Sequence, residues 1–183
     1  VTDYTRSGTQ ISIAAGSLTG TATVSAASDT IDESNETVIV DITSVANGTE
    51  SGTQQVTVTI TDDDAPPTVT LSVNTSAIAE ASGVATFTAT LSTVSGQTVT
   101  VDLGFSGTAA NGSDYTPSGT QITIPAGSLT GTATVTAVSD SSDESDETVI
   151  VDITGVTNGI ESGTQQQTVT ITDDDGGPAV TLS

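Results

Sequence analysis

Short runs in which apolar and polar residues alternate occur along most of the chain. VATFTATL at 84–91 and QTVTVDL at 97–103 place an apolar residue at nearly every second position. This period of two predicts strands that bury one face. By the same criterion we expect strands at 68–73, 84–91, 97–103, 119–124, 130–138, 147–155 and 164–172. Helical periodicity is absent, so the pattern predicts an all-β fold with antiparallel sheets.

The alternating pattern recurs because the chain contains an internal repeat. Residues 3–72 align without insertion with residues 114–183 at an offset of 111, and 55 of the 70 aligned pairs are identical. A period of 111 residues is too long for a solenoid turn but suits a whole β-sandwich domain. The expected domains and linkers are a partial repeat at 1–64, a linker at 65–67, a complete repeat at 68–175, a linker at 176–178 and the start of a following repeat at 179–183.

The partial repeat lacks counterparts of the first three predicted strands of the complete one. Alone, residues 1–64 should expose apolar faces and unpaired strand edges, so they are not expected to form an independent domain. Two explanations stay open. The segment is an excerpt from a longer array, which we favour, or a neighbouring chain supplies the missing strands.

The charge of the chain limits its partners. It has 23 acidic residues, one basic residue (Arg6), no histidine and a formal net charge of -22. Nothing therefore offers positive charge to nucleic acid, anionic membranes or polyphosphate. Cysteine is absent as well, which excludes disulfides and zinc fingers. The composition is typical of a large secreted cell-surface protein, and we expect any export or anchoring signal to lie outside this segment.

The acidic residues gather at the predicted connections between strands. SDSSDESDET at 139–148 joins two strands, Asp173–Asp175 end the last strand, Asp114 precedes another and Glu80 lies between the first two. If these loops share one pole of a sandwich, about eight carboxylates converge there. Oxygen ligands from several loops suit Ca²⁺, whereas the lack of histidine and cysteine disfavours zinc and copper.

Four linked motifs carry a resemblance to a known family. They are IAEASG, SDYTPSGTQITIPAG, SDSSDESDET and ITDDD, and together they resemble the Calx-beta domain. The resemblance implies tandem seven-stranded immunoglobulin-like sandwiches that bind Ca²⁺ through the loops at one end. The ligands it implies in the complete repeat are Glu80, Asp114, Asp140, Glu144, Glu147, Asp173, Asp174 and Asp175. Their counterparts in the partial repeat are Asp3, Asp29, Glu33, Glu36, Asp62, Asp63 and Asp64.

Two departures from the family pattern reduce the number of ligands. Ser139 and Ser28 stand where the family often has a first aspartate of a pair, and the partial repeat has no counterpart of Glu80. We therefore expect fewer than four ions per domain. Asp143 and Asp146 are left undecided, and Asn35 replaces Asp146 in the other copy.

These observations favour a non-enzymatic function. Paired carboxylates can hydrolyse glycosides, but the chain has few aromatic residues to form a sugar platform. We expect a calcium-binding structural repeat that acts as a rigid spacer or filament segment of an extracellular surface protein, with neighbouring repeats or neighbouring chains as its partners. The alternatives are an adhesin module that recognises glycans or proteins and a regulatory domain that senses calcium.

Overall fold

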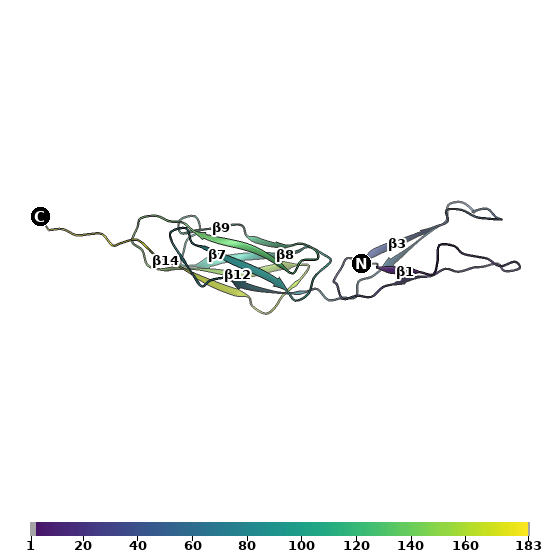
Figure 1. The fold of residues 1–183 in the computed structure, drawn as a ribbon, viewed down its shortest axis with the longest axis horizontal. Coiled ribbons are helices and arrows are strands. Elements are labelled where there is room, and N and C mark those ends of the chain that lie inside the picture. Colours follow the sequence, from purple (N-terminus) through teal and green to yellow (C-terminus); the bar gives the residue numbers. More distant parts are fainter. Residues whose placement is uncertain (1–2, 183) are drawn as a thin grey trace. The chain divides into compact units, whose positions relative to one another are not determined.

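The computed structural model describes residues 3–182, which fall into two compact units. The first unit comprises residues 3–30 and 34–63, and the second comprises residues 31–33 and 64–182. Every regular element in the described part of the chain is a strand (Figure 1). Accordingly, those residues contain no helix long and apolar enough to cross a membrane.

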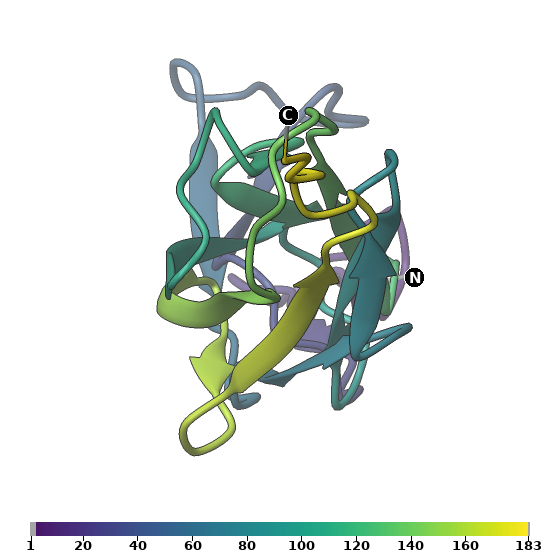
Figure 2. The same cartoon turned by 90° about the vertical axis from the view of Figure 1, so that its left-hand side faces the viewer.

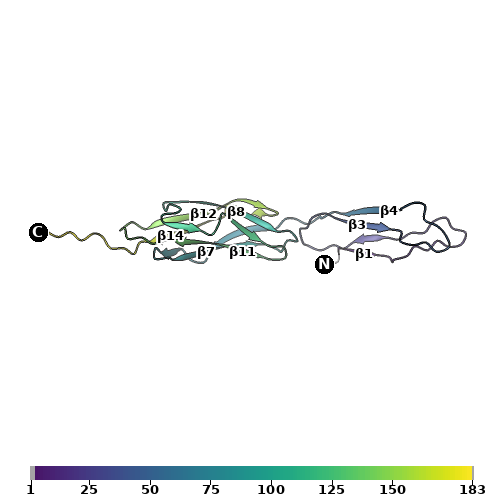
Figure 3. The same cartoon turned by 90° about the horizontal axis from the view of Figure 1, so that it is seen from above.

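The second unit is a sandwich of two five-stranded sheets, which Figure 3 shows as two layers. The first sheet has the order β10-β8-β12-β14-β6, and the second has the order β13-β5-β7-β11-β9. The strand bounds are β5 (Thr68–Val73), β6 (Ala77–Ala79), β7 (Val84–Leu91), β8 (Val99–Gly107), β9 (Tyr115–Pro117), β10 (Gln121–Ile124), β11 (Thr130–Ala137), β12 (Glu147–Thr157), β13 (Ile160–Glu161) and β14 (Gln166–Thr172).

The alternating sequence fills the space between the sheets. In β7 every second residue from Ala85 to Leu91 is buried, and the Thr residues between them face outward. Val, Ile, Leu and Ala form most of the core, and Phe87 is its largest fully buried side chain. Threonine and valine suit such strands because their branched side chains pack well on a pleated surface.

The structure confirms the predicted all-β sandwich, and it adjusts the bounds of some strands and adds three short ones. All seven predicted strands are present, and 68–73 and 84–91 have the predicted bounds. Three short strands that were not predicted, β6, β9 and β13, complete the sheets. The main pairings are antiparallel, as predicted, but β13 pairs with β5 and β14 pairs with β6 in parallel. These two parallel pairs join strands from opposite ends of the repeat.

The first unit contains only part of this architecture. It has two two-stranded sheets, formed by β1 (Tyr4–Arg6) with β2 (Val24–Ala26) and by β3 (Glu36–Asp41) with β4 (Gln55–Ile60). Many of its apolar side chains are exposed, as predicted for a repeat that lacks its first strands.

Candidate metal site

The acidic residues of the complete repeat meet at one end of the sandwich because strand pairing places their loops together. Glu80 follows β6, and its amide continues the parallel pairing by donating to the Thr172 carbonyl at 3.0 Å. This contact brings Glu80 beside Asp173, the first residue after β14. Figure 2 views the sandwich along its long axis, with the chain after β14 (yellow) leaving the end that faces the viewer.

Asp114 is fixed by its neighbour Tyr115. The Tyr115 side chain is buried and lies 6.3 Å from Phe105, measured between ring centroids. Asp114 accepts hydrogen bonds on its carboxylate from the Ala110 amide and on its carbonyl from the Val138 amide. The second bond ties Asp114 to the end of β11, where the acidic loop 139–148 begins. An anchored aromatic ring next to a solvent-facing carboxylate explains the D-Y pair in the sequence.

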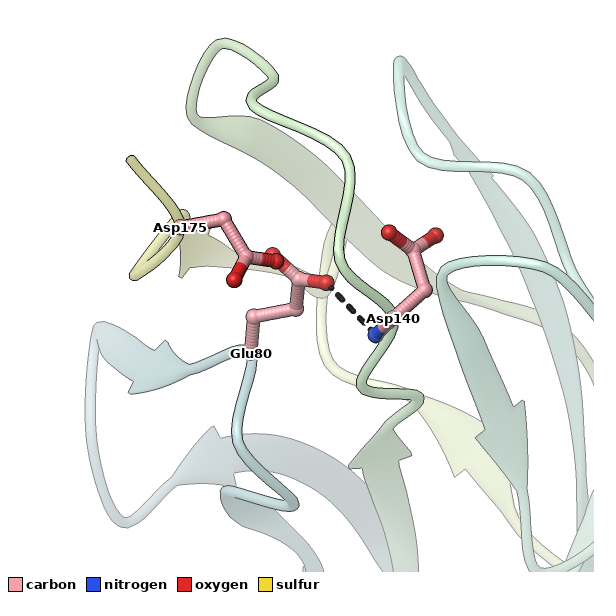
Figure 4. Close-up of side chains that lie close together, drawn as sticks. All are labelled: Glu80, Asp140 and Asp175. Atoms are coloured by element: carbon pink, nitrogen blue, oxygen red, sulfur yellow. Dashed lines mark hydrogen bonds between the residues drawn. The ribbon is translucent and has the colours of Figure 1, made fainter. Parts of the chain in front are cut away.

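One group of three carboxylates consists of Glu80, Asp140 and Asp175. Each offers one oxygen, and these oxygens lie within 4.8 Å of one another. Figure 4 shows the Glu80 and Asp175 carboxylates facing each other, while the Asp140 backbone amide donates to Glu80 Oε1 at 3.1 Å. The Glu80 side chain is buried, with only 7% of the residue exposed. A buried glutamate among other acids requires a compensating partner.

A second group consists of Asp114, Glu144 and Glu147, whose oxygens also lie within 4.8 Å of one another. All members of the two groups except Asp175 line one pocket, which has six acidic residues together with Val138, Ser145 and Ile171. These acidic residues are Glu80, Asp114, Asp140, Glu144, Glu147 and Asp173.

The surroundings of the carboxyls shift their pKa values in both directions. The amide of Asp140 lowers the pKa of Glu80, but burial, the charges of Asp140 and Asp173 and the side-chain hydrogen bond of Asp173 together outweigh it, so the net pKa is raised. Burial and the nearby Asp114 raise the pKa of Glu147. Burial and the neighbouring aspartates, Asp173 first among them, raise the pKa of Asp175. Each of these three groups is therefore harder to ionise than in water.

Two carboxyls of the pocket are shifted the other way. The Ala110 amide, which donates to the carboxylate, is the main cause that lowers the pKa of Asp114. The Ser142 amide has the same effect on the pKa of Asp140, and its hydrogen bond to Asp140 Oδ1 is 2.6 Å long. Backbone N–H groups thus hold these two side chains in the charged form.

The pocket fits a cation by three further criteria. Asp173 Oδ1 is inaccessible to solvent and has no hydrogen-bond donor, so the protein leaves one acceptor unsatisfied there. Two oxygens on opposite sides of a Ca²⁺ ion are about 4.8 Å apart when each Ca–O distance is about 2.4 Å. The oxygens of each group lie within that separation, which is compatible with one ion bound between them. No side chain of the pocket lining carries positive charge.

The structure separates the three consecutive aspartates. Asp173 and Asp175 are partly buried toward the acidic groups, whereas Asp174 is exposed and belongs to neither group nor to the pocket lining. Strand-like alternation after β14 accounts for this difference, since successive side chains point to opposite sides. Seven of the eight residues predicted in the complete repeat are thus brought together.

Asp146, which the sequence leaves undecided, has a backbone partner. Its Oδ1 accepts from the Asp173 amide at 3.2 Å. In the first unit Asn35 occupies the same place, and its Oδ1 accepts from the Asp62 amide at 2.9 Å. An Asp-to-Asn exchange keeps the acceptor oxygen and loses the charge, so this position orients the DDD segment. The sequence signal for that role is the difference between the two copies, which have Asp146 and Asn35 at this position.

The predicted residues of the partial repeat are not assembled in the same way. Among residues 3–182, only the two groups described above bring three such side chains within 4.8 Å. Asp62 and Asp64 are partly buried and Asp63 is exposed, which repeats the alternation of Asp173–Asp175. The other predicted positions are partly buried at Asp3, Asp29 and Glu33 and exposed at Glu36.

The fold and the acidic pocket define a β-sandwich module with a cluster of acidic side chains at one end, which is a candidate cation site. The sequence model of the Calx-beta domain matches residues 1–64 and 62–175, so the chain belongs to the Calx-beta family, as the motifs indicated. No curated protein matches the chain.

Among the solved structures that are similar to it are three of low sequence identity. The apo-form Calx CBD1 domain has 19% identity and a TM-score of 0.49, with 59% of this chain and 99% of that chain covered. CBD12 from CALX1.2 and the calcium binding domain CBD12 of CALX1.1 each have 21% identity and a TM-score of 0.48, with 54% of this chain and 41% of theirs covered.

Proposed function

We propose that the complete repeat binds Ca²⁺ in the acidic pocket and acts as a non-enzymatic structural module. The observation that carries this proposal is the convergence of six acidic residues from four separate segments on one pocket; one of the six, Asp173, has a buried carboxylate oxygen with no hydrogen-bond donor. Glu80, Asp140 and Asp175 would hold one ion, and Asp114, Glu144 and Glu147 a second one. Two ions agree with the expectation of fewer than four. Membership of the Calx-beta family supports calcium over other divalent cations.

The proposed module belongs to a secreted cell-surface protein, in which it serves as a spacer. The support is the composition, namely a net charge of -22 without cysteine, and the near identity of the two copies. Calcium affinity of extracellular modules is commonly about 10⁻⁴–10⁻³ M, which suits extracellular rather than cytosolic calcium. The two linkers, 65–67 and 176–178, directly follow the DDD segments in sequence. An ion held by Glu80, Asp140 and Asp175 would restrict the chain where it leaves the repeat, because Asp175 is the last residue before the linker.

Calorimetric titration of the whole chain with CaCl₂ tests this proposal. We expect binding in the range of about 10⁻⁴–10⁻³ M and at least tenfold weaker binding of one ion in Glu80→Gln. Asp174→Asn is the matched control, because it removes the same charge from a neighbouring position outside the pocket. Equal weakening by both substitutions would show that net charge alone attracts the ion, and the absence of binding by the wild-type chain would refute the proposal.

A further inference from the structure

The chain enters and leaves the complete repeat on strands that run parallel to each other. β5 and β6, the first two strands, pair in parallel with β13 and β14, the last two. The repeat therefore begins at one end of these pairs and ends at the other. A pull on the chain before β5 and after β14 draws the paired strands past each other along their length. Such a shear loads all the bonds between the strands at once, whereas a pull from one end breaks them one after another.

The pairing of β6 with β14 is the first contact that this shear would load. The Thr170 amide donates to the Ser76 carbonyl at 2.9 Å, and the Glu80 amide donates to the Thr172 carbonyl at 3.0 Å. The Thr172 hydroxyl adds a third bond by donating to the Ile78 carbonyl at 3.2 Å. These bonds follow one another along the whole length of β6, so a shear has to break them together.

The pairing of β5 with β13 is the second such contact, and it is short. It has two bonds of 2.9 Å, from the Ile160 amide to the Pro67 carbonyl and from the Ser162 amide to the Val69 carbonyl. The register of the two strands ends at Val69. Backbone groups of alternate residues point to the same edge of a strand. Leu71 therefore presents its N–H and C=O groups to this edge at a place that β13 does not reach.

Two glutamine side chains take the place of a partner strand at Leu71. Gln165 Oε1 accepts from the Leu71 amide at 3.0 Å, and Gln167 Nε2 donates to the Leu71 carbonyl at 3.0 Å. A side-chain amide offers the same kinds of donor and acceptor as a peptide group. Gln167 is part of β14 and Gln165 directly precedes that strand, which lies in the other sheet. We call these two residues the glutamine pair; they connect β5 directly to β14.

Gln165 is held in place by two bonds of its own. Its backbone amide donates to Glu161 Oε1 at 2.6 Å, and its side-chain Nε2 donates to the Ser162 carbonyl. Because Nε2 is engaged in this way, Oε1 is the atom left to face Leu71. Both bonds of the glutamine pair are partly buried. Shielding from water strengthens a hydrogen bond and removes competing partners.

We propose that the complete repeat carries mechanical load, and that the glutamine pair supplies the part of the load-bearing contact for which β13 is too short. A pull on the linkers passes from β5 and β6 straight into β14. This assigns a task to the spacer proposed above, and it needs no bound ion. The same two bonds would also serve stability alone, so the test has to vary the direction of the pull.

Single-molecule force spectroscopy of the whole chain provides this test. It is done in a chelator, so that its outcome does not depend on the proposed calcium site. The chain has no cysteine, so handles can be attached at introduced ones. Ala65→Cys with Gly177→Cys pulls from opposite ends of the parallel pairs, and Ala81→Cys with Gly177→Cys pulls from the same end. We expect the opposite-end pull to require at least about twice the unfolding force, because its bonds break together.

The variant Gln167→Val removes one bond of the glutamine pair. It introduces the residue that the other copy has at this place, Val56. We expect it to raise the unfolding rate about tenfold in the opposite-end pull, because the Leu71 carbonyl loses its donor. The same-end pull should be unchanged, since β6 separates from β14 before β5 is loaded. Gln166→Val is the matched control, because it makes the same exchange at an exposed neighbouring position.

Equal unfolding forces in the two directions would overturn the load-bearing role. An equal effect of Gln167→Val in both directions would mean that the glutamine pair contributes only to general stability. The same effect from Gln166→Val would mean that the bond to Leu71 is not the cause. Either of these two results would overturn the role assigned to the glutamine pair.

Discussion

Calcium should stabilise the complete repeat by an amount that follows from the two groups of carboxylates. An ion at a concentration about 100 times its dissociation constant adds about 2.7 kcal/mol to the free energy of unfolding. Two ions, one per group, therefore add about 5 kcal/mol. A domain of this size shifts its melting temperature by at least about 4 °C per kcal/mol, so we expect an increase of about 20 °C for two ions and about 10 °C for one.

Differential scanning calorimetry of the whole chain measures this increase. The protein is scanned with a chelator, with about 10 mM CaCl₂, which is about 100 times a dissociation constant of about 10⁻⁴ M, and with NaCl at the same ionic strength. NaCl only screens the repulsion among the carboxylates, so its effect should be much smaller. MgCl₂ is a second control, because Mg²⁺ needs near-octahedral geometry and retains its water.

The variant Glu80→Gln separates ion binding from relief of repulsion. In the chelator it should melt at a higher temperature than the wild type, because the raised pKa of Glu80 shows that its ionised form is disfavoured in the fold. In calcium it should gain less stability than the wild type, because one ligand is lost. An equal increase from NaCl and CaCl₂, or a lower melting temperature of the variant in the chelator, would refute this reasoning.

Three further outcomes are expected. Asp146→Asn should leave the free energy of unfolding unchanged, whereas Asp146→Ala should lower it by about 1 kcal/mol in urea titrations, because only alanine removes the acceptor of the Asp173 amide. Without calcium, denaturant titrations should show stability rising as the pH falls from neutrality toward the ordinary values of 4.5 and 3.8 for Glu and Asp, because the three carboxyls with raised pKa take up protons in the fold first. Below about pH 3.8 stability should fall, because the two carboxyls with lowered pKa lose their charge; a stability that falls steadily from neutrality would contradict these shifts. Phe87→Ala should destabilise the complete repeat by about 3–5 kcal/mol, measured as a lower urea midpoint, because its side chain is the largest in the core.

The sequence predicts long strands well and short ones poorly. β5 and β7 have the predicted bounds because six to eight residues contain three to four periods of the alternating pattern. β6 and β13 contain three and two residues, too few to show any period. Their existence depends on parallel partners almost a whole repeat away, so only the folded chain defines them.

The candidate site, too, could be predicted from the sequence only in part. The sequence locates the acidic loops, and the family motifs identify the residues within them. The sequence does not show toward which side the side chains of Asp173, Asp174 and Asp175 point, because that depends on how the strand continues past Thr172. Nor does it show the split into two groups, because that depends on which loops the pairing of β6 with β14 brings together.

β3 and β4 pair in the same register as their counterparts β12 and β14, and this has a consequence for synthesis of the chain on the ribosome. The pairs β9–β11 and β12–β14 join residues about 20 apart, and the partial repeat forms both without help. The pairs β8–β12 and β14–β6 span about 40 to 90 residues, so each repeat closes only after its last strand has emerged. During that interval β5–β8 of one repeat are free to pair with the matching strands of another. Because residues 3–64 nearly repeat the partner strands of the complete repeat, we expect exchange of strands between repeats to be one route to misfolding.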